Sequence, residues 1–197
     1  MKILATILLL VFASINNSNA FTTTASPYFG LSLSKSKLDM AETGAVSYKG
    51  LMPSSYTNTG FFFGLDLHEN LGFEFGYENS RAKSMETNGA YGIDSLSARI
   101  ATIRYDILGK YNMTPETTLV GILGIVQGIS SVSTSGSAIN GNVQQGGFSN
   151  GWEYGAGVWR AYDERIFGKV EYRKQNVEYG GIANSSSSLL LGVGIRL

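Results

Sequence analysis

The sequence predicts an all-β fold, an eight-stranded antiparallel up-and-down transmembrane β-barrel. Three observations indicate it. Of 197 residues, 25 are glycine and 12% are aromatic, but only 15% are charged, against about 25% in typical soluble domains. Apolar residues recur with period two, the pattern of strands, and no later run approaches the roughly 20 residues of a membrane helix. The connections between these stretches are alternately short and long along the chain, which is typical of barrels that cross a bilayer.

Residues 1–20 are predicted to be a cleavable secretory signal peptide. Lys2 gives the positive start, Ile3–Ala13 the apolar run, and Ser18 and Ala20 the small side chains of a cleavage site. The apolar run is too short to span a bilayer. Residues 21–197 would then form the exported barrel domain.

Composition excludes several functions. Fifteen basic and fifteen acidic residues give a formal charge of zero, so nothing favours binding to nucleic acid. Cysteine is absent, which rules out disulfides, thiol nucleophiles and zinc–thiolate sites. His68 is the only histidine and cannot form a clustered zinc site. We therefore expect neither a metal nor a cofactor.

Eight segments alternate with period two: 28–37, 57–67, 71–81, 97–109, 117–131, 150–160, 166–177 and 186–197. Short turns are predicted at 68–70, 110–116 and 161–165, and longer loops at 38–56, 82–96, 132–149 and 178–185. Both termini then lie on the short-turn side. In a barrel of the bacterial outer membrane this side is periplasmic and the long loops are extracellular.

Most of these segments have one apolar face and one polar or small face. The apolar faces are Phe61/Phe63/Leu65/Leu67, Leu71/Phe73/Phe75/Tyr77, Ala101/Ile103/Tyr105/Ile107, Ile166/Gly168/Val170/Tyr172 and Leu189/Leu191/Val193/Ile195/Leu197. Segment 117–131 is apolar at both parities, so its orientation is left open.

The polar face is predicted to line the lumen. It combines charges of both signs with glycines, which suits an eight-stranded interior just wide enough for side chains to fill. A charge at the middle of the lipid face would cost about 2–4 kcal/mol. Arg99, Arg160 and Lys174 share the apolar face but lie near strand ends, where long side chains can reach the headgroups.

A hairpin near the C-terminus carries a family resemblance. Gly151–Val158 (GWEYGAGV), the turn with Asp163 and Glu164, and Gly168–Arg173 (GKVEYR) resemble the penultimate hairpin of opacity-type and OmpA-like outer-membrane barrels. The terminal Leu191-x-Val193-x-Ile195-x-Leu197 is similar to the C-terminal signal of those proteins, although their last residue is usually aromatic. The resemblance implies a surface protein in contact with outer-membrane lipid and lipopolysaccharide, and recognition of the last strand by the barrel assembly machinery.

Five charged residues are predicted to face the lumen and to form an ion-pair network: Glu74, Arg104, Lys169, Glu171 and Arg173. Because buried charges must be paired, we expect a packed structural plug. The alternative is a narrow pore for ions or small solutes, for which eight strands leave little room.

Catalysis is not expected. Some eight-stranded outer-membrane barrels modify lipid A, so a His/Ser/acid constellation around His68 must be considered. Its position at the 68–70 turn supplies no partner at a suitable spacing. Tyr105, Tyr111, Trp159, Tyr162 and Tyr172 are instead expected on the outer wall as aromatic girdles.

The long loops are where function is expected, because rigid scaffolds present variable loops. Loops 38–56 and 82–96 are the candidates for a host or matrix ligand site, and a hydrated cap without a partner is the alternative. The predicted function is a non-enzymatic surface protein that supports envelope integrity and adhesion.

Overall fold

The computed structural model describes residues 25–40, 53–86, 95–136, 139–179 and 183–197, and almost all of them form one antiparallel sheet. Its strands are β1 (Ser26–Met40), β2 (Ser55–His68), β3 (Leu71–Ser80), β4 (Lys83–Glu86), β5 (Ser95–Asn112), β6 (Thr117–Gly136), β7 (Ile139–Ala161), β8 (Ile166–Asn176) and β9 (Ala183–Arg196). No helix in these ranges is long and apolar enough to cross a membrane.

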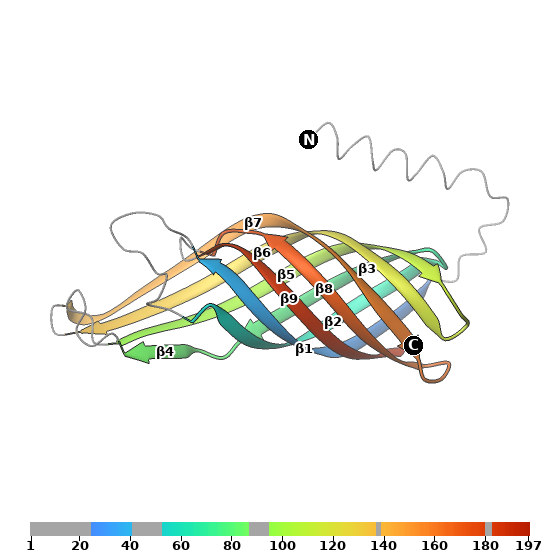
Figure 1. Cartoon of the computed structure of the whole chain (residues 1–197), viewed down its shortest axis with the longest axis horizontal. Coiled ribbons are helices and arrows are strands. Elements are labelled where there is room, and N and C mark those ends of the chain that lie inside the picture. The colour runs from blue at the N-terminus through green and yellow to red at the C-terminus, as the bar shows by residue number, and fades with distance from the viewer. Residues whose placement is uncertain (1–24, 41–52, 87–94, 137–138, 180–182) are drawn as a thin grey trace, which may run out of the picture.

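The sheet closes on itself. Its strand order is β3-β2-β1-β9-β8-β7-β6-β5-β4, and β3 also pairs with β5 (Figure 1). β3 and then β4 pair with successive parts of β5, so the two together occupy one position in the barrel. The predicted eight-stranded antiparallel barrel is confirmed. The predicted signal peptide, and loop residues 41–52 and 87–94, lie outside the described residues.

The strands at the long-loop end are longer than predicted. The prediction of a loop over 132–149 is wrong for most of that range, because β6 continues to Gly136 and β7 begins at Ile139. Their pairing runs without interruption from Thr117↔Arg160 to Thr134↔Val143. β4 and the start of β5 likewise occupy parts of the expected loop 82–96. Backbone pairing extends these strands where side-chain alternation no longer indicates them.

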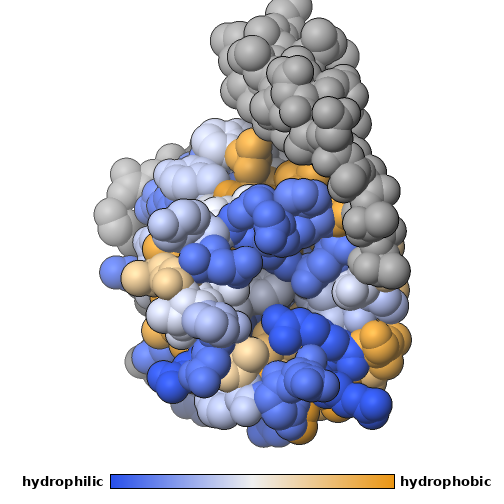
Figure 2. Space-filling view, turned by 90° about the vertical axis from the view of Figure 1, so that its right-hand side faces the viewer, coloured by the Kyte–Doolittle hydropathy of each residue, from blue (hydrophilic) through white to orange (hydrophobic). Residues whose placement is uncertain are grey.

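The outer wall of the barrel is apolar, as predicted. Every strand except the short β4 turns large hydrophobic side chains outward, among them Phe29, Leu31, Phe61, Phe63, Phe73, Tyr105, Leu123, Val158, Val170 and Leu191. Figure 2 looks onto the short-turn end, where hydrophilic residues gather, with hydrophobic residues towards the margins. An apolar band between two polar ends is what a bilayer-spanning barrel requires.

Segment 117–131, whose orientation the sequence left open, is now oriented by its neighbours. On β6, Val120, Ile122 and Val126 are buried inside the barrel, while Leu123 and Ile125 are exposed on the outer wall. Pairing with β5 and β7 fixes this, because a shift of one residue would reverse every side chain.

Trp159 corrects the expected aromatic girdle. It points inward with only 3% of its surface exposed, whereas Tyr105, Tyr111, Tyr162 and Tyr172 are exposed. Trp159 shares its face with Glu153, Gly155 and Gly157, and it stacks on Phe167 with ring centroids 5.1 Å apart. The interior near the short turns is therefore aromatic, which the polar-lumen argument did not anticipate.

The turn at 161–165 is held by one carboxylate. Asp163 Oδ1 accepts hydrogen bonds from the backbone amides of Arg165 (2.8 Å) and Ile166 (2.5 Å). These bonds favour the ionised carboxylate, so they lower its pKa below the usual value of 3.8.

Asp163→Ala is therefore expected to reduce stability at neutral pH. A lowered pKa gives a contribution that is present above pH 4 and is lost as the pH falls through the folded-state value. The difference between wild type and variant in the urea midpoint should be constant from pH 5 to pH 8 and shrink below pH 4. A difference that grew on acidification would contradict this.

Candidate functional site: the filled barrel interior

The middle of the barrel holds a cluster of buried charges, here called the central ion network. It consists of Glu74, Glu78, Arg104, Asp106, Glu153, Lys169, Glu171 and Arg173. Strands β3, β5, β7 and β8 supply these side chains from positions that alternate with the apolar outer wall. The period-two pattern therefore brings together charges that lie up to 99 residues apart in the sequence.

Arg173 on β8 is the hub of the network. Its Nη1 lies 2.6 Å from Asp106 Oδ2 and 2.9 Å from Glu153 Oε1. Its Nη2 lies 2.7 Å from Glu171 Oε2 and 3.3 Å from Glu74 Oε1. One guanidinium thus contacts four carboxylates, which uses the fixed fork of donors that only arginine offers.

Lys169 occupies the same network, one inward position before Glu171. Its Nζ lies 2.7 Å from both carboxylate oxygens of Glu74 and 3.3 Å from Glu171 Oε1. It also lies 3.7 Å from the centroid of the Phe62 ring, a cation–π contact. Lys169 therefore joins the charges to the aromatic layer beside them.

Arg104 pairs with Glu78 at the other side of the network. Arg104 Nη2 lies 3.1 Å from Glu78 Oε1, an ionic contact without hydrogen-bond geometry. Glu78 also accepts a 2.5 Å hydrogen bond from Ser34 Oγ. All five lumen charges named from the sequence are thus buried and ion-paired in the interior.

Three members were not singled out from the sequence. Glu78 and Asp106 lie on the polar faces of their strands, and the same alternation includes them. Glu153 shares a face with Gly151, Gly155 and Gly157, so its parity was a usable signal. The network holds five carboxylates and three cations. The overall composition of the chain could not predict this local excess of acidic residues.

Apolar clusters close the interior on both sides of the network. The short-turn cluster is Tyr28, Phe62, Leu108, Val120, Ile122, Trp159 and Phe167. The long-loop cluster is Leu38, Tyr56, Leu96, Ala98, Ile100, Val126, Val132, Val177, Tyr179 and Ala183. On β5 the three layers follow one another as Ile100, Arg104 and Leu108, all 3% exposed or less.

Hydrogen bonds tie the layers together. Trp159 Nε1 donates to Glu171 Oε1 at 2.8 Å, and the Tyr28 hydroxyl donates to Glu74 Oε2 at 3.3 Å. On the other side, Gln175 Nε2 donates to Glu153 Oε2 at 2.8 Å, and Gln175 Oε1 accepts from the Tyr179 hydroxyl at 2.9 Å. Trp159 and Tyr28 thus donate to carboxylates on the short-turn side, and Gln175, held by Tyr179, does so on the long-loop side, as buried polar groups require.

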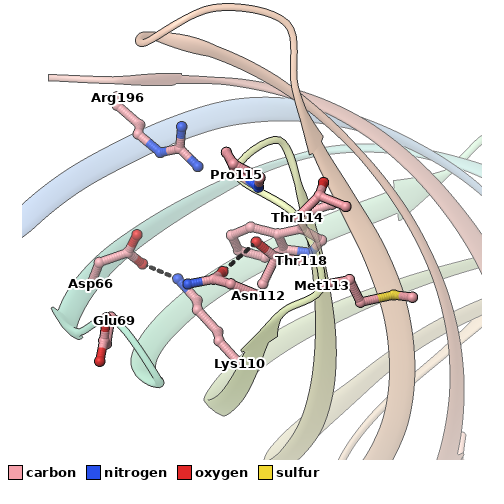
Figure 3. Close-up of a pocket in the computed structure, with 10 residues that line it drawn as sticks. Asp66, Glu69, Lys110, Asn112, Met113, Thr114, Pro115, Thr118 and Arg196 are labelled. Carbon is pink, nitrogen blue, oxygen red and sulfur yellow. Dashed lines mark hydrogen bonds and ion pairs between the residues drawn. The ribbon is translucent and has the colours of Figure 1, made fainter.

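A polar vestibule opens at the short-turn end. It has a volume of about 560 Å³ and is lined by Asp66, Glu69, Lys110, Asn112, Met113, Thr114, Pro115, Thr118, Trp159 and Arg196. Figure 3 shows Lys110 directed at Asp66, and Thr118 joined to Asn112 by a 2.8 Å hydrogen bond. Trp159, a member of the short-turn cluster, belongs to its wall. The vestibule therefore ends on packed aromatic rings.

His68 lies at the exposed β2–β3 turn. Its Nδ1 accepts a hydrogen bond from the backbone amide of Asn70 at 3.2 Å, so it caps the turn. Within the ranges that the structure describes, no group of three or more His, Cys, Asp or Glu side chains could hold a metal ion.

A closed antiparallel barrel with an apolar outer wall and a filled, charged interior defines a transmembrane β-barrel. The chain belongs to the family described as the outer membrane protein beta-barrel domain, whose model matches residues 5–196. Membership indicates the bacterial outer membrane. Comparison with curated proteins finds no match.

Solved structures of outer-membrane barrels share the fold. Neisserial surface protein A is 15% identical, with 87% of this chain and 97% of that chain covered and a TM-score of 0.60. Ail of Yersinia pestis, in complex with the heparin analogue sucrose octasulfate, is 13% identical over 88% and 97%, with a TM-score of 0.55. The N-terminal β-barrel domain of Pseudomonas aeruginosa OprF is 14% identical over 88% and 100%, with a TM-score of 0.50. These findings confirm the resemblance to opacity-type and OmpA-like barrels.

Proposed function

We propose that this chain is a non-enzymatic surface protein: the barrel anchors it in the outer membrane, and its long-loop end binds host cells or extracellular matrix. The observation that carries the proposal is the filled interior. Two apolar clusters and an ion network occupy the lumen, so the surface beyond the barrel remains for function. The network then serves as an internal brace that supports envelope integrity.

The long-loop end offers an extended surface. Ile139 and residues 143–151 of β7 pair with β6, whereas the pairing of β7 with β8 begins only at Trp152. At about 3.3 Å per residue, this stretch amounts to roughly 40 Å of strand. Figure 1 shows β4, β5, β6 and β7 continuing past the rest of the barrel on the side opposite the C-terminus. A projection of paired strands of this kind supports a binding role.

The adhesion test displays the chain on a non-adherent bacterium. One variant shortens loops 38–56 and 82–96, and a second removes the β6–β7 tip between Ser133 and Gln144, which face each other. Host cells, matrix proteins and heparin are offered, heparin because Ail was crystallised with a heparin analogue. Heat-modifiable gel mobility shows that each variant folds. Binding by wild type that either trimming abolishes is expected, and no binding by folded wild type would refute adhesion.

We further propose that the long-loop end is extracellular and that both termini are periplasmic. Trypsin added to intact cells should then cut at exposed Lys83 and spare exposed Arg165 in the 161–165 turn. Lysed cells serve as the control, in which both sites are open. Cleavage at Arg165 alone on intact cells would show that the barrel has the opposite orientation.

The runner-up function is a small pore for ions or solutes. The polar vestibule favours it, but a path from there would have to cross the short-turn cluster and then the network. Planar-bilayer recordings of the purified barrel are expected to give no stable open steps. Trp159→Ala removes the largest ring of the short-turn cluster. It is the matched variant that tests whether this cluster is what blocks a path through the lumen. Stable openings of the wild type would favour the pore.

A further inference from the structure

Three lysines from distant parts of the sequence meet on the outer wall. Lys37 on β1 and Lys174 on β8 each lie directly opposite Ser187 of the intervening strand β9. Lys35 lies opposite Leu189, one outward position nearer the middle of the barrel. Because directly opposite residues in a sheet have Cβ atoms about 5 Å apart, Lys37 and Lys174 are separated by roughly 10 Å. Their flexible side chains can converge on one headgroup.

These lysines stand at the edge of the apolar band. The next outward row towards the short turns is Leu33, Leu191 and Val170, and the row after it includes Leu31 and Val193. All five of these side chains are exposed. The lysines therefore lie at the depth where hydrocarbon gives way to lipid headgroups.

A groove leads from the lysines into the apolar band. It is a shallow depression of about 430 Å³ between β1 and β9, lined by Leu31, Ser32, Leu33, Leu191, Gly192 and Val193. Leu33, at the end of the groove nearer the lysines, is the next outward-facing residue to Lys35 on β1. An apolar groove below a cationic rim matches a lipid that has acyl chains and a negatively charged headgroup.

Among the described residues, none holds these three lysines away from such a headgroup. Within the described ranges their side chains make no ion pair or hydrogen bond with the protein. Among the described residues, the acidic neighbours Asp39 and Glu178 lie farther towards the loops, and Asp39 is contacted by Ser185 Oγ at 3.5 Å. By contrast, Arg99 donates to Asn79 Oδ1 at 2.8 Å, and Lys83 donates to the carbonyl of Ser55 at 2.5 Å.

We propose that Lys35, Lys37 and Lys174, with the β1–β9 groove, bind one molecule of lipid A, the phosphorylated anchor of lipopolysaccharide. Its phosphates contact the lysines and an acyl chain occupies the groove. The spread of the lysines favours a headgroup with two phosphates over a glycerophospholipid with one. The proposal rests on family membership and on the long-loop end being in the outer leaflet, and does not depend on adhesion.

Titration of the purified full-length barrel in a neutral detergent tests this, with native mass spectrometry as the readout. The probes are bisphosphorylated lipid A, lipid A dephosphorylated on the same acyl chains, and phosphatidylglycerol. The variant K35Q/K37Q/K174Q is expected to bind lipid A about 100-fold more weakly, from three basic contacts near the membrane surface. The matched control, R81Q/K83Q/R99Q, loses the same charge at the same end and should change affinity no more than a few-fold.

A second pair of variants tests the groove. L33A/L191A removes its walls, and L123A/I125A removes two exposed side chains on β6, away from the groove. About tenfold weaker binding is expected for the first pair, from the lost apolar contact, and no change for the second. Equal losses of affinity from K35Q/K37Q/K174Q and from R81Q/K83Q/R99Q, or wild-type affinity after K35Q/K37Q/K174Q, would overturn the site. Equal affinity for dephosphorylated lipid A or phosphatidylglycerol would overturn the assignment to lipid A.

Discussion

Replacing Arg173 with methionine is expected to destabilise the barrel by about 3–5 kcal/mol, because removing one partner of a buried pair leaves uncompensated charge. Arg173 contacts Asp106, Glu153, Glu171 and Glu74. Without it, the network's five carboxylates face only Arg104 and Lys169. Methionine fills much of the same volume, so the expected loss comes mainly from charge.

Urea unfolding of the purified barrel in detergent measures the effect, followed by the gel mobility of unheated samples. Arg160→Met is the matched control, because Arg160 pairs with Glu116 at 3.5 Å on the surface and is 66% exposed. Exposed pairs contribute about 0–1 kcal/mol, so its midpoint should barely move. If R173M fails to fold, R173M/E171Q, with one less negative charge, should recover part of the folded band. Equal midpoints for R173M and R160M would show that the network is not a brace.

Gly64→Ala is expected to destabilise the barrel by about 1–3 kcal/mol through overpacking. Gly64 lies directly opposite Tyr28 across β1 and β2. The Tyr28 ring and hydroxyl occupy the place that a Cβ at residue 64 would need. The ring cannot easily give way, because it packs edge-on against Trp159 and Phe167 at 5.5 Å between centroids.

Gly109→Ala is the control for this prediction. A Cβ at Gly109 would meet nothing within 4 Å, so the same change should be neutral or slightly stabilising, through a less flexible unfolded chain. In the Y28A background the overlap is absent, so G64A should cost less stability there than in the wild type, as a double-mutant cycle measures. The measurement is the folded fraction after refolding into detergent, with the urea midpoint of what folds. If G64A and G109A behave alike, the ring does not limit this position.

These two predictions address different parts of the same interior. The substitution of Arg173 tests the charges of the central ion network. The substitution of Gly64 tests the aromatic packing of the short-turn cluster beside it. Tyr28 connects the two, because its hydroxyl donates to Glu74. Side chains are therefore packed through successive layers of the interior, which supports the proposed anchor role over the alternative of a pore.

The eight predicted strand positions of the barrel were confirmed, with β3 and β4 sharing one of them. The faces that were predicted were confirmed in direction as well, because alternation on a half-apolar strand is a local property. Boundaries at the long-loop end were wrong for a physical reason. Residues 132–149 are mostly Ser, Gly, Asn and Gln without a charge, and no apolar face alternates there. β6 and β7 continue through this segment because each supplies backbone hydrogen-bond partners to the other.

By itself, the sequence determined the membrane barrel, its apolar outer wall and the five lumen charges, since each follows from spacing along one strand. Only the tertiary structure decided which charges meet, because the contact of Arg173 with Glu74 depends on barrel closure. The same holds for the inward Trp159, the orientation of β6, and the row of Lys37, Ser187 and Lys174. These depend on register between strands, and register is set by many pairings at once, which no single segment contains.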